Sequence, residues 1–64
     1  DRAIAELRAA AALLPDSATV YSSLGSCCAA LGLRHEAERA WRTAMRLDPR
    51  AKEPRRNLAR LRRL

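Results

Sequence analysis

The chain has 64 residues, a formal net charge of +6 and a hydrophobic content of 48%. This length allows one small domain, and this apolar content excludes a disordered acidic tail. The apolar runs are too short for a transmembrane helix, so we expect no membrane partner. Tyr21 and Trp41 are the only aromatic residues, so a core has to be built mainly from Ala and Leu.

Three breaks divide the chain into four segments rich in Ala, Leu and Arg, which are strong helix formers. The breaks are Pro15-Asp16-Ser17, Gly32 and Asp48-Pro49. In the first segment, apolar residues recur at intervals of three and four, which predicts a helix over residues 1–14.

The second helix is predicted over residues 17–31. Asp16 or Ser17 can cap its N-terminus by accepting from free backbone N–H groups. Gly32 can adopt the left-handed turn that ends it. Apolar residues along one side predict the third helix over residues 35–47.

The fourth helix is predicted over residues 53–63, with Pro54 in its first turn, where proline is tolerated. The predicted turns between helices are two to five residues long, which makes sequential helices antiparallel neighbours. The sequence therefore predicts an all-α fold of about four helices. Residues 50–64 hold seven basic groups and one acidic group, Glu53, and so account for the excess charge of the chain.

The middle of the chain, residues 16–49, resembles a tetratricopeptide repeat. This family has a 34-residue helix–turn–helix unit with fixed aromatic, Leu-Gly, Ala, aromatic and Pro positions. The matching residues are Tyr21, Leu24, Gly25, Gly32, Ala37, Trp41, Ala44 and Pro49. Cys28 departs from the pattern, because the family usually has Tyr at that position.

The resemblance implies how the chain is organised. Residues 1–15 would be the second helix of a preceding repeat, 16–49 a complete repeat, and 50–64 a C-terminal capping helix with a polar outer face. Arg55 and Arg62 stand at family core positions, which suits a helix that no further repeat covers. We therefore expect the C-terminal part of a longer α-solenoid array, with upstream repeats of its own chain as packing partners.

The family pattern also implies the packing of the central helices. Gly25 and Ala37 should lie at a close helix–helix contact, with Trp41 buried beside Leu24. Neighbouring helix residues point about 100° apart. Cys28 should therefore be buried in its core position, and Cys27 more exposed.

The resemblance implies a protein-interaction scaffold. In such arrays the first helix of each repeat lines a concave groove that takes a peptide or helix of a partner protein. The groove-facing candidates carried over to this sequence are Thr19, Ser22, Ser26, Ala29, Arg56, Asn57 and Arg60. A wall of small side chains opposite a basic wall favours an acidic segment or a chain-terminal carboxylate as the partner.

Two other interpretations of the basic end stay open. Its arginines can serve only to solubilise the terminal helix of the array. Alternatively, Arg55, Arg62 and their neighbours can contact the phosphates of nucleic acid or another polyanion. No aromatic residue lies among them to stack a base, so nucleic acid is the less favoured partner.

Catalysis has no support in the sequence. His35 is the only histidine, and general acid–base chemistry needs a second oriented group. Glu36 and Glu38 lack the histidine spacing of a metal site. We expect no enzyme activity, no catalytic residue, no cofactor and no metal. A bond between the adjacent Cys27 and Cys28 would be strained, so free thiols in a reducing, cytoplasmic compartment are expected.

Overall fold

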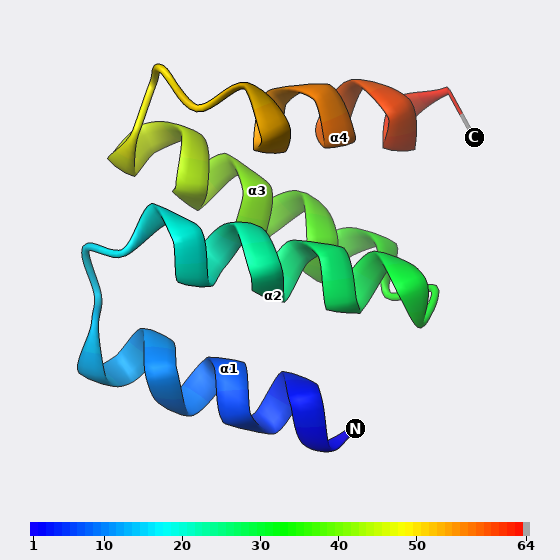
Figure 1. Cartoon of the computed structure of the whole chain (residues 1–64). Helices are drawn as coiled ribbons and strands as arrows, with labels where there is room; N and C mark the ends of the chain where they lie inside the picture. The colour runs from blue at the N-terminus through cyan, green and yellow to red at the C-terminus, as the bar shows by residue number, and fades with distance from the viewer. Residues whose placement is uncertain (64) are drawn as a thin grey trace.

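A computed structural model describes residues 1–63 as four α-helices joined by short turns, and the predicted all-α fold is confirmed (Figure 1). The helices are α1 (Arg2–Leu13), α2 (Ala18–Ala30), α3 (Arg34–Leu47) and α4 (Lys52–Arg62). Each bound lies within one residue of its prediction. Leu64, the last residue of the predicted capping segment, lies outside the described residues.

The helix ends follow from local chemistry. Ser17, rather than Asp16, caps α2: its Oγ accepts a hydrogen bond from the backbone N–H of Val20 at 3.2 Å. Gly32 has a φ of 78°, the left-handed conformation that the prediction required. The third helix begins at Arg34 without a side-chain cap.

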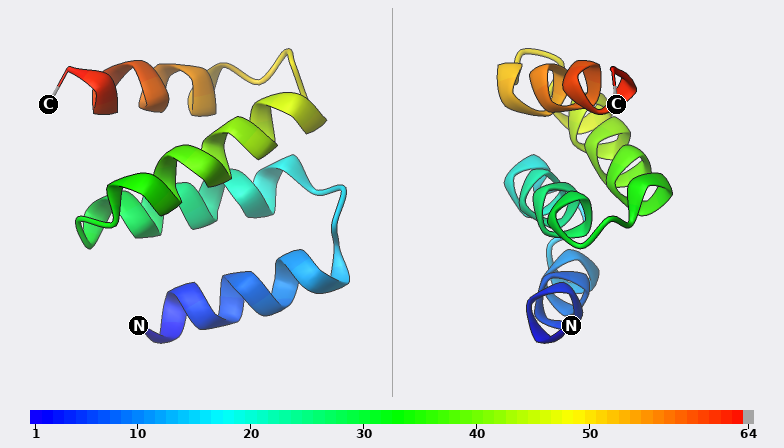
Figure 2. Two further views of the ribbon diagram at one scale, coloured as in Figure 1. Left: turned by 180° about the vertical axis from the view of Figure 1, so that it is seen from behind. Right: turned by 90° about the vertical axis from the view of Figure 1, so that its right-hand side faces the viewer.

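Successive helices run in opposite directions, so α2 and α4 run the same way (Figures 1 and 2). The molecule is a thin slab with principal extents of 32 × 27 × 13 Å. α3 packs against both α2 and α4, α1 packs against α2, and α2 also contacts α4. This arrangement leaves two parallel helices, α2 and α4, side by side against α3.

The core lies where α2, α3 and α4 meet, and Trp41 is its largest side chain. The residue is only 4% exposed, and its indole Nε1–H donates to the backbone oxygen of Ser22 at 3.2 Å. The indole ring lies against Gly25, where an added Cβ would come 2.5 Å from Cδ1 of Trp41. Ala37 is fully buried, and Leu24 packs against the core cluster. The packing predicted for these four residues is therefore confirmed.

The two cysteines face different surroundings, as predicted. Cys28 is buried, Cys27 is half-buried, and both are free thiols. Burial is the main cause that raises the pKa of the Cys28 thiol, with a smaller opposing effect from Arg8. In the described part of the chain, no helix has the length and apolar character that crossing a membrane requires.

Candidate functional site

The strongest candidate site is the channel between α2 and α4, which we call the α2–α4 groove. It consists of two hollows that follow one another along these helices, at their N-terminal and C-terminal ends. In the first hollow, α2 supplies Ala18, Thr19, Ser22 and Ser23, and α4 supplies Lys52, Glu53 and Pro54. In the second, α2 supplies Ser26, Ala29 and Ala30, and α4 supplies Asn57, Arg60 and Leu61. α3 contributes Trp41 to the second hollow.

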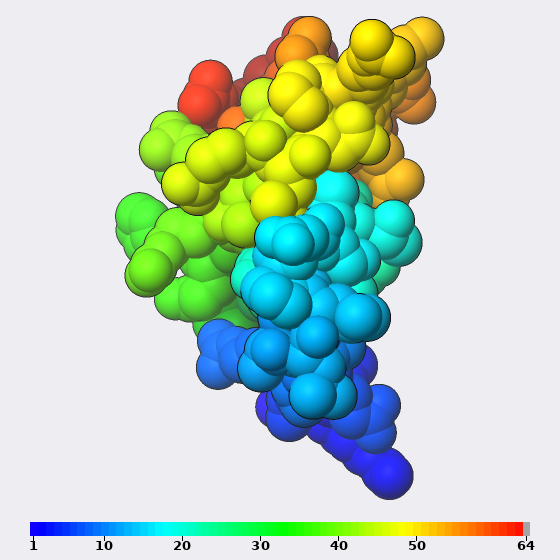
Figure 3. Space-filling view, turned by 90° about the vertical axis from the view of Figure 1, so that its left-hand side faces the viewer, coloured from blue at the N-terminus to red at the C-terminus, as the bar shows by residue number. Residues whose placement is uncertain are grey.

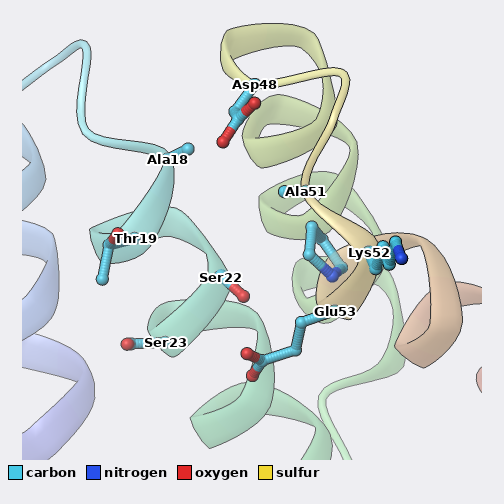
Figure 4. A pocket seen from close by; sticks show the side chains of 9 residues that line it. Ala18, Thr19, Ser22, Ser23, Asp48, Ala51, Lys52 and Glu53 are labelled. Carbon is cyan, nitrogen blue, oxygen red and sulfur yellow. The ribbon is translucent and has the colours of Figure 1, made fainter.

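The first hollow has a volume of about 310 Å³ and lies beside the turn between α3 and α4. Figure 3 shows this end of the molecule, where that turn (yellow) lies above the start of α2 (cyan). Thr19 and Ser22 supply hydroxyl groups from α2, and Asp48 and Glu53 supply carboxylates from the opposite side. Both carboxylates point into the space between the helices, whereas the Lys52 ammonium points away from it (Figure 4).

These carboxylates have no cation bound to them within the described part of the chain. Its two ion pairs are Arg2–Glu6 and Arg42–Glu38, both between residues four apart on one helix. Asp48 uses one oxygen to accept from the backbone N–H of Arg50 at 3.2 Å. The first hollow is therefore an acidic end of the groove.

The second hollow has a volume of about 350 Å³. Small side chains of α2 form one wall, including Ser26 and Ala29, while Trp41 and Leu61 supply apolar surface. Asn57 and Arg60 of α4 supply hydrogen-bond donors. Among residues 1–63, no carboxylate lines this hollow, so it is a basic, partly apolar end of the groove.

Six of the seven predicted groove residues line these two hollows. They are Thr19 and Ser22 in the first, and Ser26, Ala29, Asn57 and Arg60 in the second. Thr19, Ser26 and Arg60 are exposed, so a partner can reach them.

Arg56 is placed differently from its predicted position. It lines a separate hollow with Arg55 and Ala59. Adjacent helix residues are about 100° apart, so a helix that turns Leu58 to the core and Asn57 to the groove turns Arg56 to solvent. The groove prediction for Arg56 therefore has to be corrected: its side chain belongs to the outer face of α4.

That outer face carries a basic hollow of about 530 Å³ between the α3–α4 turn and α4. Four cationic residues line it: Arg50, Lys52, Arg55 and Arg56. Within the described part of the chain no carboxylate lines it, and Arg55 donates to the backbone oxygen of Pro49 at 3.3 Å. All charged residues that line this outer hollow are basic, whereas the lining of the groove contains charges of both signs.

Sequence reasoning missed Asp48, Trp41 and Leu61 as residues of the groove. Asp48 follows the last residue of α3, and the antiparallel packing of α2 and α3 brings that end of α3 to the start of α2 (Figure 1). Trp41 was expected in the core, and it does lie there. Because the neighbouring residues of α2 are small, part of the Trp41 side chain still lines the groove.

The described residues gather no group of three side chains that could hold a metal ion. His35 is exposed at the start of α3 and lines neither hollow of the groove. The groove offers hydroxyl, amide, guanidinium and carboxylate groups that can form hydrogen bonds.

Comparison of the chain with protein-family models, with curated proteins and with solved structures found no match.

Proposed function

We propose that this chain is a tetratricopeptide-like interaction module whose α2–α4 groove binds a segment of a partner protein. The observation that supports this most directly is the position of the six predicted residues. The family pattern assigns them to a groove, and in the structure they line two adjoining hollows between α2 and α4. The assignment of α1 to a preceding repeat and of α4 to a cap stays a prediction.

The dimensions of the groove suit a peptide. From Thr19 to Ala30, α2 rises about 16 Å at 1.5 Å per residue, which equals about five residues of extended chain. The small side chains of α2 leave space for a backbone to approach. Asn57 can donate to a peptide carbonyl, and Arg60 can form a charge-assisted hydrogen bond with a carboxylate. An acidic residue at the Arg60 end is therefore the expected partner chemistry.

The proposed role is binding without catalysis, and it needs no cofactor. The free thiols of Cys27 and Cys28 suit a reducing compartment, so we place the protein in the cytoplasm. A partner there has to present an exposed, extended or helical segment.

The outer face of α4 supports a second candidate function, the binding of nucleic acid or another polyanion. Its basic hollow brings four cations together without a carboxylate. Phosphate contacts made by such a surface depend steeply on salt. This candidate uses Arg55 and Arg56, whereas the peptide proposal uses Asn57 and Arg60.

Single substitutions to Ala separate the two functions. We expect Asn57→Ala and Arg60→Ala to weaken binding of an acidic nine-residue peptide by about three- to tenfold. The matched controls Arg55→Ala and Arg62→Ala, on the same helix, should leave that affinity unchanged. Isothermal titration calorimetry at two salt concentrations measures the affinity of each variant for the peptide and for a generic DNA duplex. If the unmodified chain binds the duplex but not the peptide, and Arg55→Ala and Arg56→Ala abolish duplex binding, the polyanion proposal replaces the peptide proposal.

A further inference from the structure

The two ends of the α2–α4 groove carry opposite charge. At the first end, the Asp48 and Glu53 carboxylates point into the space between the helices, and Lys52 points away (Figure 4). At the second end, Arg60 is the charged residue of the lining, beside Asn57. A ligand that runs along the groove therefore meets a negative and then a positive group.

The negative end has features of a site that a cationic group would complete. Neither of its carboxylates belongs to the two ion pairs of the described residues. In addition, Ser22 lines this end, and its Oγ is shielded from solvent without a hydrogen-bond partner in the described structure. Because this oxygen is shielded, the exposed carboxylates of Asp48 and Glu53 are the groups that a ligand cation can reach at this end.

We infer that the groove selects a bipolar peptide, with a basic residue at the Asp48–Glu53 end and an acidic residue at the Arg60 end. The inference rests on the proposed function and specifies its partner more narrowly than an acidic segment. A uniformly acidic peptide satisfies Arg60 but is repelled by Glu53, and a uniformly basic peptide has the opposite mismatch. Complementary charge at both ends gives selectivity as well as attraction.

The spacing of the two peptide charges follows from the helix. Glu53 and Arg60 are seven residues apart on α4, which is about 10 Å along its axis. An extended chain advances about 3.3 Å per residue, and alternate side chains point the same way. A basic and an acidic residue four positions apart share one face of the peptide and span about 13 Å, within reach of both long side chains.

The apolar surface at the basic end adds a requirement. Trp41 and Leu61 are buried in the core but also line this hollow, where Ala29 faces them. An apolar side chain two positions from the acidic residue points the same way and can cover this surface. The inferred motif is thus a basic, an apolar and an acidic residue at alternate positions of an extended segment.

The test uses three capped nine-residue peptides that differ at two positions. The bipolar peptide has Lys and Glu four positions apart with Leu midway between them. It is made in both chain orders, and the tighter order is used. The doubly acidic peptide replaces Lys by Glu, and the doubly basic peptide replaces Glu by Lys. We expect the 64-residue chain to bind the bipolar peptide about fivefold more tightly than either alternative.

Charge reversal in the protein should reverse this preference. Glu53→Lys should make the doubly acidic peptide the tightest ligand, and Arg60→Glu should do the same for the doubly basic peptide. Glu36→Lys is the matched control for the first variant, because Glu36 and Glu53 both lie in the first turn of a helix. Arg62→Glu is the control for the second, because Arg60 and Arg62 both lie in the last turn of α4. Both controls should keep the preference of the unmodified chain, and circular dichroism checks that all variants are helical.

The outcomes separate the inference from the proposed function. If the doubly acidic peptide binds as tightly as the bipolar one, and only Arg60→Glu weakens it, the inference is overturned and the peptide-binding function stands. If neither Glu53→Lys nor Arg60→Glu alters the preference, the inference is also overturned. If none of the three peptides binds the unmodified chain, the proposed function fails together with the inference.

Discussion

Between α2 and α3, the indole ring of Trp41 lies directly against a glycine, and its N–H donates to the backbone of the same helix. Between α3 and α4, the contact is instead made by three side chains of α4, Pro54, Leu58 and Leu61. The remaining surface of α4 is mostly charged. The first contact depends on space that a single methyl group would fill, whereas the second depends on the amount of apolar surface that is covered.

The difference between the two contacts explains how the site is supported. The α2–α3 contact fixes the position of the small-residue wall of the groove, because Trp41 bonds to Ser22 in that wall. The α3–α4 contact positions the charged wall, with help from Arg34, whose guanidinium donates to the backbone oxygen of Leu61 at 3.2 Å. The α2–α3 contact should therefore tolerate very few substitutions, and the α3–α4 contact more.

The largest effect is expected for Trp41→Ala. It removes the biggest core side chain and leaves a cavity, so the free energy of unfolding should fall by about 3–5 kcal/mol. This equals much of the total stability expected for a small domain. Urea unfolding followed by circular dichroism measures it, with Trp41→Phe as the milder control that keeps an aromatic ring. A change below about 1 kcal/mol for Trp41→Ala would show that the α2–α3 contact does not depend on the ring.

Leu58→Ala tests the other side of the comparison. Loss of this buried side chain should lower the free energy of unfolding by about 2–3 kcal/mol and release α4 before the other helices. Leu58→Met conserves volume and should lower it by less than about 1.5 kcal/mol. Hydrogen exchange resolves the local effect: α4 amides should exchange faster while α3 amides keep their protection. Equal acceleration in both helices would contradict the proposed difference.

The two glycines test whether space or backbone conformation matters at each position. Gly25→Ala forces the Trp41 ring to move and should lower the free energy of unfolding by about 1–3 kcal/mol. Ala37→Leu should have a similar effect for the same reason. Gly32 has open space around it and needs only its positive φ, so Gly32→Asn should be tolerated better than Gly32→Ala. Thermal melts of these variants and of Gly25→Asn measure the effects. If Gly25→Asn and Gly32→Asn lowered the melting temperature equally, the assignment of limited space to Gly25 and of backbone conformation to Gly32 would be contradicted.

The smallest effect concerns thiol reactivity and leaves stability at neutral pH unchanged. Cys27 should react with a thiol reagent faster than Cys28, because Cys28 is buried and its pKa is raised. The folded state holds the Cys28 proton more tightly, so folding stability should fall as the pH rises above about 9, where the unfolded thiol ionises first. Cys28→Ser should remove this pH dependence, and Cys27→Ser should keep it. Faster labelling of Cys28 would reverse the assigned faces of α2.

The helices and their central contact were predictable because they depend on local patterns. The breaks at Pro15 and Gly32 set the helix ends, and the resemblance to the tetratricopeptide pattern implied the close contact at Gly25 and Ala37 with Trp41 buried beside it. The position of Arg56 was not predictable to the same accuracy, because one residue of helical rotation moves a side chain by about 100°. The Arg34–Leu61 contact was also missed, since a long arginine can reach several carbonyl oxygens and the sequence does not select one.

The central claim is that the α2–α4 groove, rather than the basic outer face of α4, is the binding surface. Backbone amide NMR during titration with the bipolar peptide tests it most directly. The account predicts shifts that saturate and are confined to groove positions, namely Thr19, Ser22, Ser26, Ala29, Glu53, Asn57 and Arg60. Shifts centred on Arg50, Arg55 and Arg56, with the groove amides unmoved, would contradict it.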